Sequence, residues 1–187
     1  MVFEWDDFGA DHIISNMCRT RDCRTELDKL HILNPRFKAT LFTVPGEMTP
    51  ELYNWCAANS SWIELAWHGF YHTSNYECEK MSYQEFDDLM NSFTPVGFAY
   101  TNGFRAPGWQ ISDQIYEWLY DHDFWVADQD YNDQRRPEKL KVYKVDDNWH
   151  GHTWNCVGNG IEETLEQLKE LVKNTADFKF ASEVVNA

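Results

Sequence analysis

The chain has 187 residues, of which 43% are hydrophobic and 25% are charged. These values exclude a disordered chain and predict one folded domain over residues 1–187. The formal net charge of −15 opposes contact with phosphates, so we expect no nucleic-acid partner. No apolar stretch approaches the roughly 20 residues that span a bilayer, and no signal peptide is visible. We therefore expect a cytoplasmic protein with no membrane partner.

Short apolar segments alternate with amphipathic ones along the chain, which is typical of βα units. The predicted strands are 2–5, 39–44, 62–66, a short one around 98–99, then 124–127, 141–145 and 178–182. The predicted helices are 50–58 with Thr49 as N-cap, one after Ser82 with Glu85 at capping-box spacing, 113–120 and 160–174. The five cysteines are spread without a CxxC pair and are expected to be free thiols. Six or seven strands separated by helices predict a parallel α/β sheet or barrel.

Reactive side chains follow two of these strands at their carboxyl ends, where α/β folds gather ligands. Asp6 and Asp7 end the first strand, and His68 and His72 follow the third. Adjacent aspartates serve one pocket only where the backbone turns; otherwise they are a solvated pair in a loop. Histidines at i and i+4 can bind one metal ion, or can be ordinary histidines bonded to backbone. One carboxylate with two imidazoles would leave coordination positions open for water and substrate.

Later strand ends carry further candidates. Arg105, in GFRAPGW, can hold Asp6 ionised through a charge-assisted hydrogen bond, or can be a surface arginine in a Pro-Gly turn. His150 and His152, in NWHGHTW, have the right chemistry to protonate a leaving group, and their spacing does not choose between them. Aromatic side chains beside these motifs can stack on sugar rings or fill the core. Those proposed to bind substrate are Tyr71, Trp109 and Trp149.

Taken in order, these motifs resemble those of the polysaccharide deacetylase superfamily, which is carbohydrate esterase family 4 and removes acetyl groups from glycans. Asp6-Asp7 resembles its first motif, His68 to His72 its HxxxH motif, and Arg105-Ala106-Pro107 its Arg-x-Pro motif. The resemblance implies a distorted (β/α) barrel with fewer than eight units. Phe8 departs from the family pattern, which has glycine directly after the aspartate pair.

The resemblance also implies roles for individual residues. Asp7, His68 and His72 would bind a divalent metal ion, with Zn²⁺ as the expected metal. Asp6 would be the general base, oriented by Arg105. A late histidine would be the general acid: His150 has the apolar neighbour that the last family motif requires, which leaves His152 unexplained. Asp128 or Asp130 would tune that histidine.

The expected function is metal-dependent hydrolysis of acetyl groups from an N-acetylated sugar or glycan, with an acetylated carbohydrate as the partner molecule. One alternative keeps the site but hydrolyses the C–N bond of a small amide or ureide. Another is a non-catalytic carbohydrate-binding domain of the same fold. A soluble α/β domain whose histidines do not converge is the plainest alternative.

Overall fold

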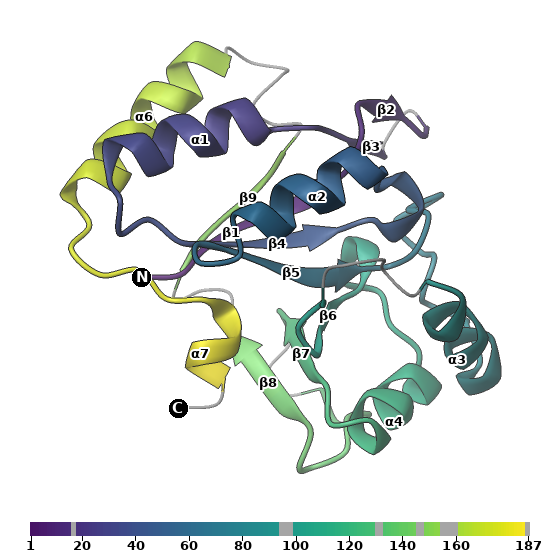
Figure 1. The fold of residues 1–187 in the computed structure, drawn as a ribbon. Helices are drawn as coiled ribbons and strands as arrows, with labels where there is room; N and C mark the ends of the chain where they lie inside the picture. Colours follow the sequence, from purple (N-terminus) through teal and green to yellow (C-terminus); the bar gives the residue numbers. More distant parts are fainter. Residues whose placement is uncertain (16–17, 94–98, 130–132, 145–147, 154–160, 186–187) are drawn as a thin grey trace.

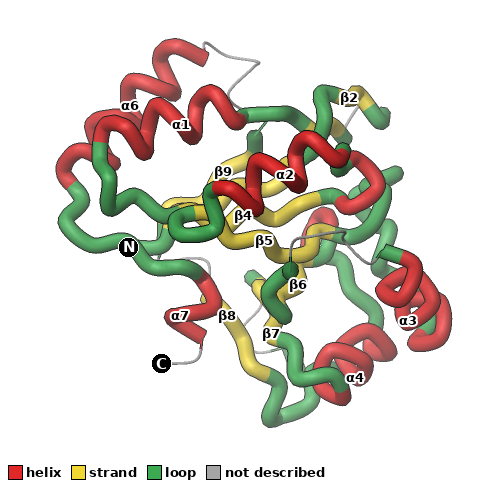
Figure 2. Tube along the Cα trace, viewed as in Figure 1, coloured by secondary structure: helices red, strands yellow, loops and turns green. Residues whose placement is uncertain are grey.

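The computed structural model describes residues 1–15, 18–93, 99–129, 133–144, 148–153 and 161–185. Seven strands form one sheet, in the order β8-β7-β6-β5-β4-β1-β9, and every neighbouring pair is parallel. The sheet curls into a half-barrel with helices around it (Figures 1 and 2). The strands are β1 (Phe3–Phe8), β4 (Ala39–Thr43), β5 (Ile63–His68), β6 (Gly103–Arg105), β7 (Trp125–Asp128), β8 (Lys141–Lys144) and β9 (Trp149–His152). This confirms the predicted α/β fold, a distorted barrel of parallel strands; its extent as one domain over 1–187 stays a prediction.

The longer helices cover the convex side of the sheet in two groups. Helices α1 (Arg24–Leu33) and α6 (Ile161–Asn174) lie side by side, with α2 (Pro50–Ala58) next to them, whereas α3 (Tyr83–Ser92) and α4 (Asp113–Asp121) form a second pair (Figure 1). Two 3₁₀ turns, Pro45–Glu47 and Pro107–Trp109, and an antiparallel pair, β2 (His12–Ile13) and β3 (Arg19–Thr20), complete the connections. None of the described helices is both long and apolar enough to cross a membrane.

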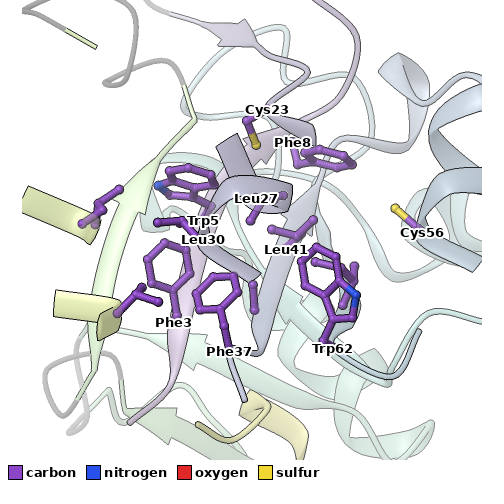
Figure 3. Close-up of a cluster of buried hydrophobic side chains, with 14 of the residues drawn as sticks. Phe3, Trp5, Phe8, Cys23, Leu27, Leu30, Phe37, Leu41, Cys56 and Trp62 are labelled. Atoms are coloured by element: carbon purple, nitrogen blue, oxygen red, sulfur yellow. The ribbon is translucent and has the colours of Figure 1, made fainter. Parts of the chain in front are cut away.

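Strand alternation divides the core into outer and inner layers. Phe3, Trp5 and Leu41 point outward into a cluster with Leu27 and Leu30 of α1 (Figure 3). Alternate positions of the same sheet form a separate inner cluster. Its strand members are Phe42, Ala66, Trp125, Ala127 and Tyr143. The inner face is therefore packed at its centre, and polar side chains gather at its two ends.

Several predicted elements are confirmed by the structure. Thr49 caps α2 by accepting a hydrogen bond from Leu52 N at 3.3 Å, and α3 begins with the predicted capping box of Ser82 and Glu85. Helices α4 and α6, and the strands that became β4, β5, β7 and β8, lie within a few residues of their predicted bounds. Cys18, Cys56 and Cys78 are free thiols, as expected, and Cys23 is a buried residue of the core, whereas Cys156 lies outside the described residues.

Three strand predictions were wrong. The first strand does not stop at Asp6 but continues to Phe8. The strand between β5 and β7 is Gly103–Arg105, whereas Ala99 is in a loop and Phe98 lies outside the described residues. Residues 178–182 form a single bridge, from Lys179 to Val2, and then enter helix α7 (Ala181–Val185). Helix α1 and strand β9 were not predicted.

Helix α7 is attached to the inner face of the barrel by a partly buried carboxylate, Glu64. Thr40 donates a hydrogen bond to Glu64 at 2.9 Å, and the Ser182 hydroxyl and backbone N–H bond the same carboxylate. The Thr40 hydroxyl in turn accepts from Ala181 N at 2.9 Å. Burial raises the pKa of Glu64 above its ordinary value, although the hydrogen bonds from Ser182 and Thr40 oppose the shift.

Replacing Glu64 with glutamine is expected to change how stability depends on pH. Because the folded-state pKa of Glu64 is raised, its stabilising contribution is present at pH values below the unfolded pKa and is lost as pH rises through the folded pKa. Glutamine can keep the contacts to Thr40 and Ser182 without carrying a charge. The free energy of unfolding of Glu64→Gln, measured relative to that of wild type, should therefore increase between pH 4 and pH 8. Urea unfolding at both pH values measures this, and a gain that shrinks with pH would contradict it.

Candidate active site

A bulge in β1 explains how two adjacent aspartates reach one pocket. Trp5 pairs with Leu41 and Phe8 pairs with Thr43, so β1 advances three residues while β4 advances two. Asp7, with φ of 63°, takes up the extra residue in a left-handed conformation. Without such a bulge, neighbouring side chains would point to opposite faces of the sheet. The two aspartates were expected to share a pocket because the strand ends there; instead, the bulge within the strand turns both side chains toward it.

The backbone of this bulge is held by the segments on either side of it. The carbonyl of Asp7 accepts hydrogen bonds from Arg21 N at 3.1 Å and from the Thr153 hydroxyl at 2.8 Å. Thr153 N also donates to the carbonyl of Asp6 at 3.0 Å. These bonds offset the cost of the unusual backbone conformation at Asp7, which is of order 1 to 3 kcal/mol.

Asp7, His68 and His72 converge on one point. The Nε2 atoms of His68 and His72 lie 3.3 Å and 3.2 Å from the same oxygen, Oδ1 of Asp7. All three side chains are buried, and their ligand atoms lie within 4.8 Å of one another. His68 is the last residue of β5, and His72 lies in the following loop with φ of 49°. The three predicted metal ligands are therefore brought together.

The hydrogen bonding of His68 shows that this cluster fits a cation. The Nδ1 atom of His68 lies 3.0 Å from the Arg105 carbonyl, which can only accept, so Nδ1 carries the proton. The lone pair of Nε2 in neutral His68 then faces a carboxylate oxygen. Two imidazole nitrogens around one carboxylate oxygen need a proton or a metal ion between them, and this donor set suits Zn²⁺ and similar divalent ions.

The titration of the two histidines differs although they share one carboxylate. Burial lowers the pKa of His68, but the charges of Asp6 and Asp7 outweigh burial and raise it overall. Burial and the nearby charge of His68 lower the pKa of His72. A second proton is thus disfavoured in this cluster, so the two rings compete for one positive charge.

A buried charge network lies beside the three converging side chains. Arg105 donates to Asp6 Oδ1 from Nη1 at 2.5 Å and to Glu4 from Nη2, and all three residues are almost fully buried. Tyr143 completes the network by donating to Glu4 Oε1 at 2.9 Å. Burial alone would raise the pKa of Asp6, but the charge of Arg105 reverses the effect and holds the pKa well below its usual range. Asp6 is therefore ionised at neutral pH, and the predicted contact with Arg105 is present.

His150 and His152 both lie near Asp6, but at different depths along β9. In the parallel register Glu4 pairs with His150 and Asp6 pairs with His152. Arg105 Nη1 lies 3.2 Å from His150 Nδ1; because a guanidinium only donates, His150 accepts there, and its Nε2 lies 3.7 Å from Asp6 Oδ2. Burial lowers the pKa of His152, so its protonated form is a stronger acid than an ordinary histidine.

The three aromatic side chains that were expected to bind substrate lie in different surroundings. Trp109 lies over Arg105 at 4.8 Å and edge-on to His150 at 5.7 Å, beside the charge network. Tyr71, next to His72, is 47% exposed. Trp149 stacks on Phe3 at 4.4 Å and belongs to the outer core. Strand alternation turns Trp149 to the opposite face from His150, so this packing supports a core role for Trp149 rather than a substrate contact.

Of the two aspartates expected to tune the general-acid histidine, only Asp128 lies among the described residues. Asp128 ends β7, accepts a hydrogen bond from the Tyr116 hydroxyl at 2.5 Å, and lies 3.6 Å from Arg136 Nη1. Asp130 lies outside the described residues. The tuning of His150 or His152 by either aspartate stays a prediction.

Comparison with known proteins gives a match only in structure. No family model matches the sequence, and no curated protein matches it. A family 4 acetyl xylan esterase from Clostridium thermocellum, in complex with a cobalt ion, superposes with a TM-score of 0.61 and 17% identity over 99% of this chain and 89% of that one. The Xyl-CE4 domain of a multidomain xylanase from the hindgut metagenome of Trinervitermes trinervoides gives a TM-score of 0.59 and 17% identity over 99% and 88%.

A third solved structure has the same architecture. It is the Bc1960 peptidoglycan N-acetylglucosamine deacetylase, with a TM-score of 0.55 and 18% identity over 96% of this chain and 84% of that one. Identities this low establish the fold and nothing finer. With its seven parallel strands curled into a half-barrel, the chain has the polysaccharide deacetylase fold, that of the family 4 carbohydrate esterases.

Proposed function

We propose that this protein is a metal-dependent deacetylase that hydrolyses acetyl groups from an N-acetylated sugar or glycan. The observation that carries the proposal is the meeting of the His68 and His72 Nε2 atoms at Asp7 Oδ1, at 3.3 Å and 3.2 Å, beside the Asp6–Arg105 ion pair. The fold neighbours support the substrate class, since they are described as acting on acetyl xylan or on peptidoglycan N-acetylglucosamine.

Asp7, His68 and His72 would hold the metal ion, with Zn²⁺ as the expected metal. Two imidazoles and one carboxylate match the three-ligand set of catalytic zinc sites, which keep a further position open. A bound divalent ion would polarise the acetyl carbonyl and lower the pKa of water toward about 7. One fold neighbour was solved with cobalt, so a Co²⁺-loaded protein is a useful spectroscopic substitute.

Asp6 would take the proton from the attacking water. The lowered pKa of Asp6 keeps the carboxylate ionised and able to accept. A carboxylate of such low pKa is a weak base, so its efficiency depends on position, and Arg105 fixes that position. The guanidinium of Arg105 lies over the Phe42 ring at 3.7 Å and is held by Glu4 on a second nitrogen. Arg105 would thus orient Asp6 rather than contact substrate.

His152 would protonate the departing amine. Both nitrogens of His150 face groups of the internal network, Arg105 at Nδ1 and Asp6 at Nε2. His152 lies level with Asp6 in the strand register, two residues closer to the carboxyl end of the barrel than His150. Substrate enters such folds at that end. Trp109 and the exposed Tyr71 are the aromatic side chains that could contact a sugar ring there.

Acetate release tests this proposal directly. The Zn²⁺-loaded protein should release acetate from N-acetylglucosamine oligomers, a chelator should abolish the release, and added Zn²⁺ should restore it. O-acetylated xylan and a panel of small linear and cyclic amides, assayed in parallel, separate the N-acetyl sugar substrate from the alternatives. Glycan binding without acetate release from any substrate would indicate a non-catalytic domain and would refute the proposal.

A further inference from the structure

The rings of His68 and His72 differ in whether a hydrogen bond at Nδ1 orients them. The ring of His68 is anchored directly, because its Nδ1 bonds the Arg105 carbonyl. The Nδ1 atom of His72 is buried and has no hydrogen-bond partner among the described residues. No ring hydrogen bond at Nδ1 therefore orients His72, and the position of its imidazole depends on the backbone that carries it.

That backbone is gathered around the carboxylate of Glu77. Oε1 of Glu77 accepts hydrogen bonds from Phe70 N at 3.2 Å and Tyr71 N at 3.0 Å, and Oε2 accepts from His72 N at 2.7 Å. Three successive N–H groups pointing at one anion form a nest, and bonds to an ionised acceptor are stronger than those between neutral groups. The shortest of the three is the bond to the histidine that lacks an anchor of its own.

The conformation of this loop needs such support. Gly69 has φ of 62° and His72 has φ of 49°, so two residues of the five-residue motif are left-handed. A Cβ atom on Gly69 would lie 2.9 Å from Glu77 Oε2 and 2.7 Å from Cγ of Pro107. The turn is therefore packed between Glu77 on one side and the Arg-x-Pro segment on the other, with no room for a side chain at Gly69.

We propose that Glu77 is a positioning residue for the metal site, which fixes the His72 imidazole against Asp7 by holding the backbone of the HxxxH turn. This inference rests on the proposed function, because it assumes that Asp7, His68 and His72 hold a metal ion. Loss of a residue that supports a metal ligand typically weakens metal binding about 10- to 100-fold. Loss of the Glu77 carboxylate should weaken metal binding by a factor of that size.

Glu77→Gln tests this directly, because a side-chain amide has one oxygen and cannot accept hydrogen bonds at both the Oε1 and the Oε2 positions. A glutamine oxygen at the Oε1 position keeps the bonds from Phe70 and Tyr71 but turns an NH₂ group toward His72 N. The matched control is Glu79→Gln, the same change at an exposed position two residues away, whose side chain makes no hydrogen bond to the turn within the described part of the chain. Zn²⁺ affinity would be measured by competition with a chromophoric chelator, and the visible absorption of bound Co²⁺ would report the coordination geometry.

Glu77→Gln should raise the Zn²⁺ dissociation constant about 10- to 100-fold and alter the Co²⁺ spectrum, while Glu79→Gln stays within about twofold of wild type. If Glu77→Gln does not fold, Glu77→Asp, which keeps the charge but is too short for all three bonds, should show a weaker form of the same change. Wild-type affinity and spectrum in a folded Glu77 variant would overturn the inference alone. A wild-type protein that binds no metal would overturn it together with the proposed function.

Discussion

Replacing His68 with alanine is expected to remove both bound metal and deacetylase activity. Asp7 and His72 would remain as two ligands. The Arg105 carbonyl would lose the hydrogen bond that it accepts from His68 Nδ1. The loss of metal affinity should exceed the roughly 10- to 100-fold that is typical of residues supporting a ligand. Elemental analysis of the purified protein and acetate release in the presence of added Zn²⁺ measure the two effects.

Two further variants separate loss of the ligand from loss of the fold. His72→Ala should give the same result with less disturbance of structure, since Nδ1 of His72 makes no hydrogen bond among the described residues. His122→Ala is the matched control, because His122 stacks on Trp118 at 3.8 Å in the outer layer and should leave metal content unchanged. Full metal content in folded His68→Ala would show that the cluster is not a metal site.

Much of the fold could be predicted because local signals agree with tertiary structure in most elements. The cap at Thr49 and the capping box at Ser82 and Glu85 place two helices correctly. The predictions were wrong where tertiary contacts determine the secondary structure. Residues 178–182 are apolar and extended in pattern, yet Thr40 and Glu64 bond the backbone N–H groups of Ala181 and Ser182, and the chain enters a helix there.

Strand β9 illustrates why an edge strand is hard to recognise. Its sequence, WHGH, contains a glycine, which is depleted in strands, and only one residue, Trp149, of the types that strands favour. It forms because β1 offers an unpaired edge, and the register with Phe3 to Asp6 brings both histidines toward the network. Sequence spacing identified the two histidines but not their depth, which depends on this register.

The candidate site could be predicted for side chains that carry a recognisable motif, but not for those that support them. Glu4 holds Arg105 from the inner face, and the only signal was its position two residues before Asp6, on the same face of one strand. Glu77 gave no signal, since its function depends on a loop conformation with two left-handed residues. The bulge at Asp7 was equally hidden, because bulges depend on pairing between strands rather than on composition.

Replacing Asp6 with asparagine is expected to retain the metal and to lose turnover. Asp6 lies beside the three proposed ligands without belonging to them, so Zn²⁺ content should stay near that of wild type. Asparagine can still accept a hydrogen bond from Arg105 but cannot take a proton from water, and removal of a general base typically costs about 10²- to 10⁴-fold in rate. The loss should appear in kcat, with little change in KM, in acetate-release kinetics on N-acetylglucosamine oligomers.

Glu4→Gln distinguishes proton transfer from mere disturbance of the ion pair. Glu4 and Asp6 share one guanidinium, and either amide substitution leaves Arg105 with a single carboxylate partner. If Asp6 acts only through the charge balance at Arg105, the two variants should lose similar amounts of activity. If Asp6 is the base, Glu4→Gln should retain much more turnover than Asp6→Asn, because only the Asp6 variant lacks the group that accepts the proton. Equal losses in kcat would exclude a base role for Asp6 and leave Arg105 as the group on which activity depends.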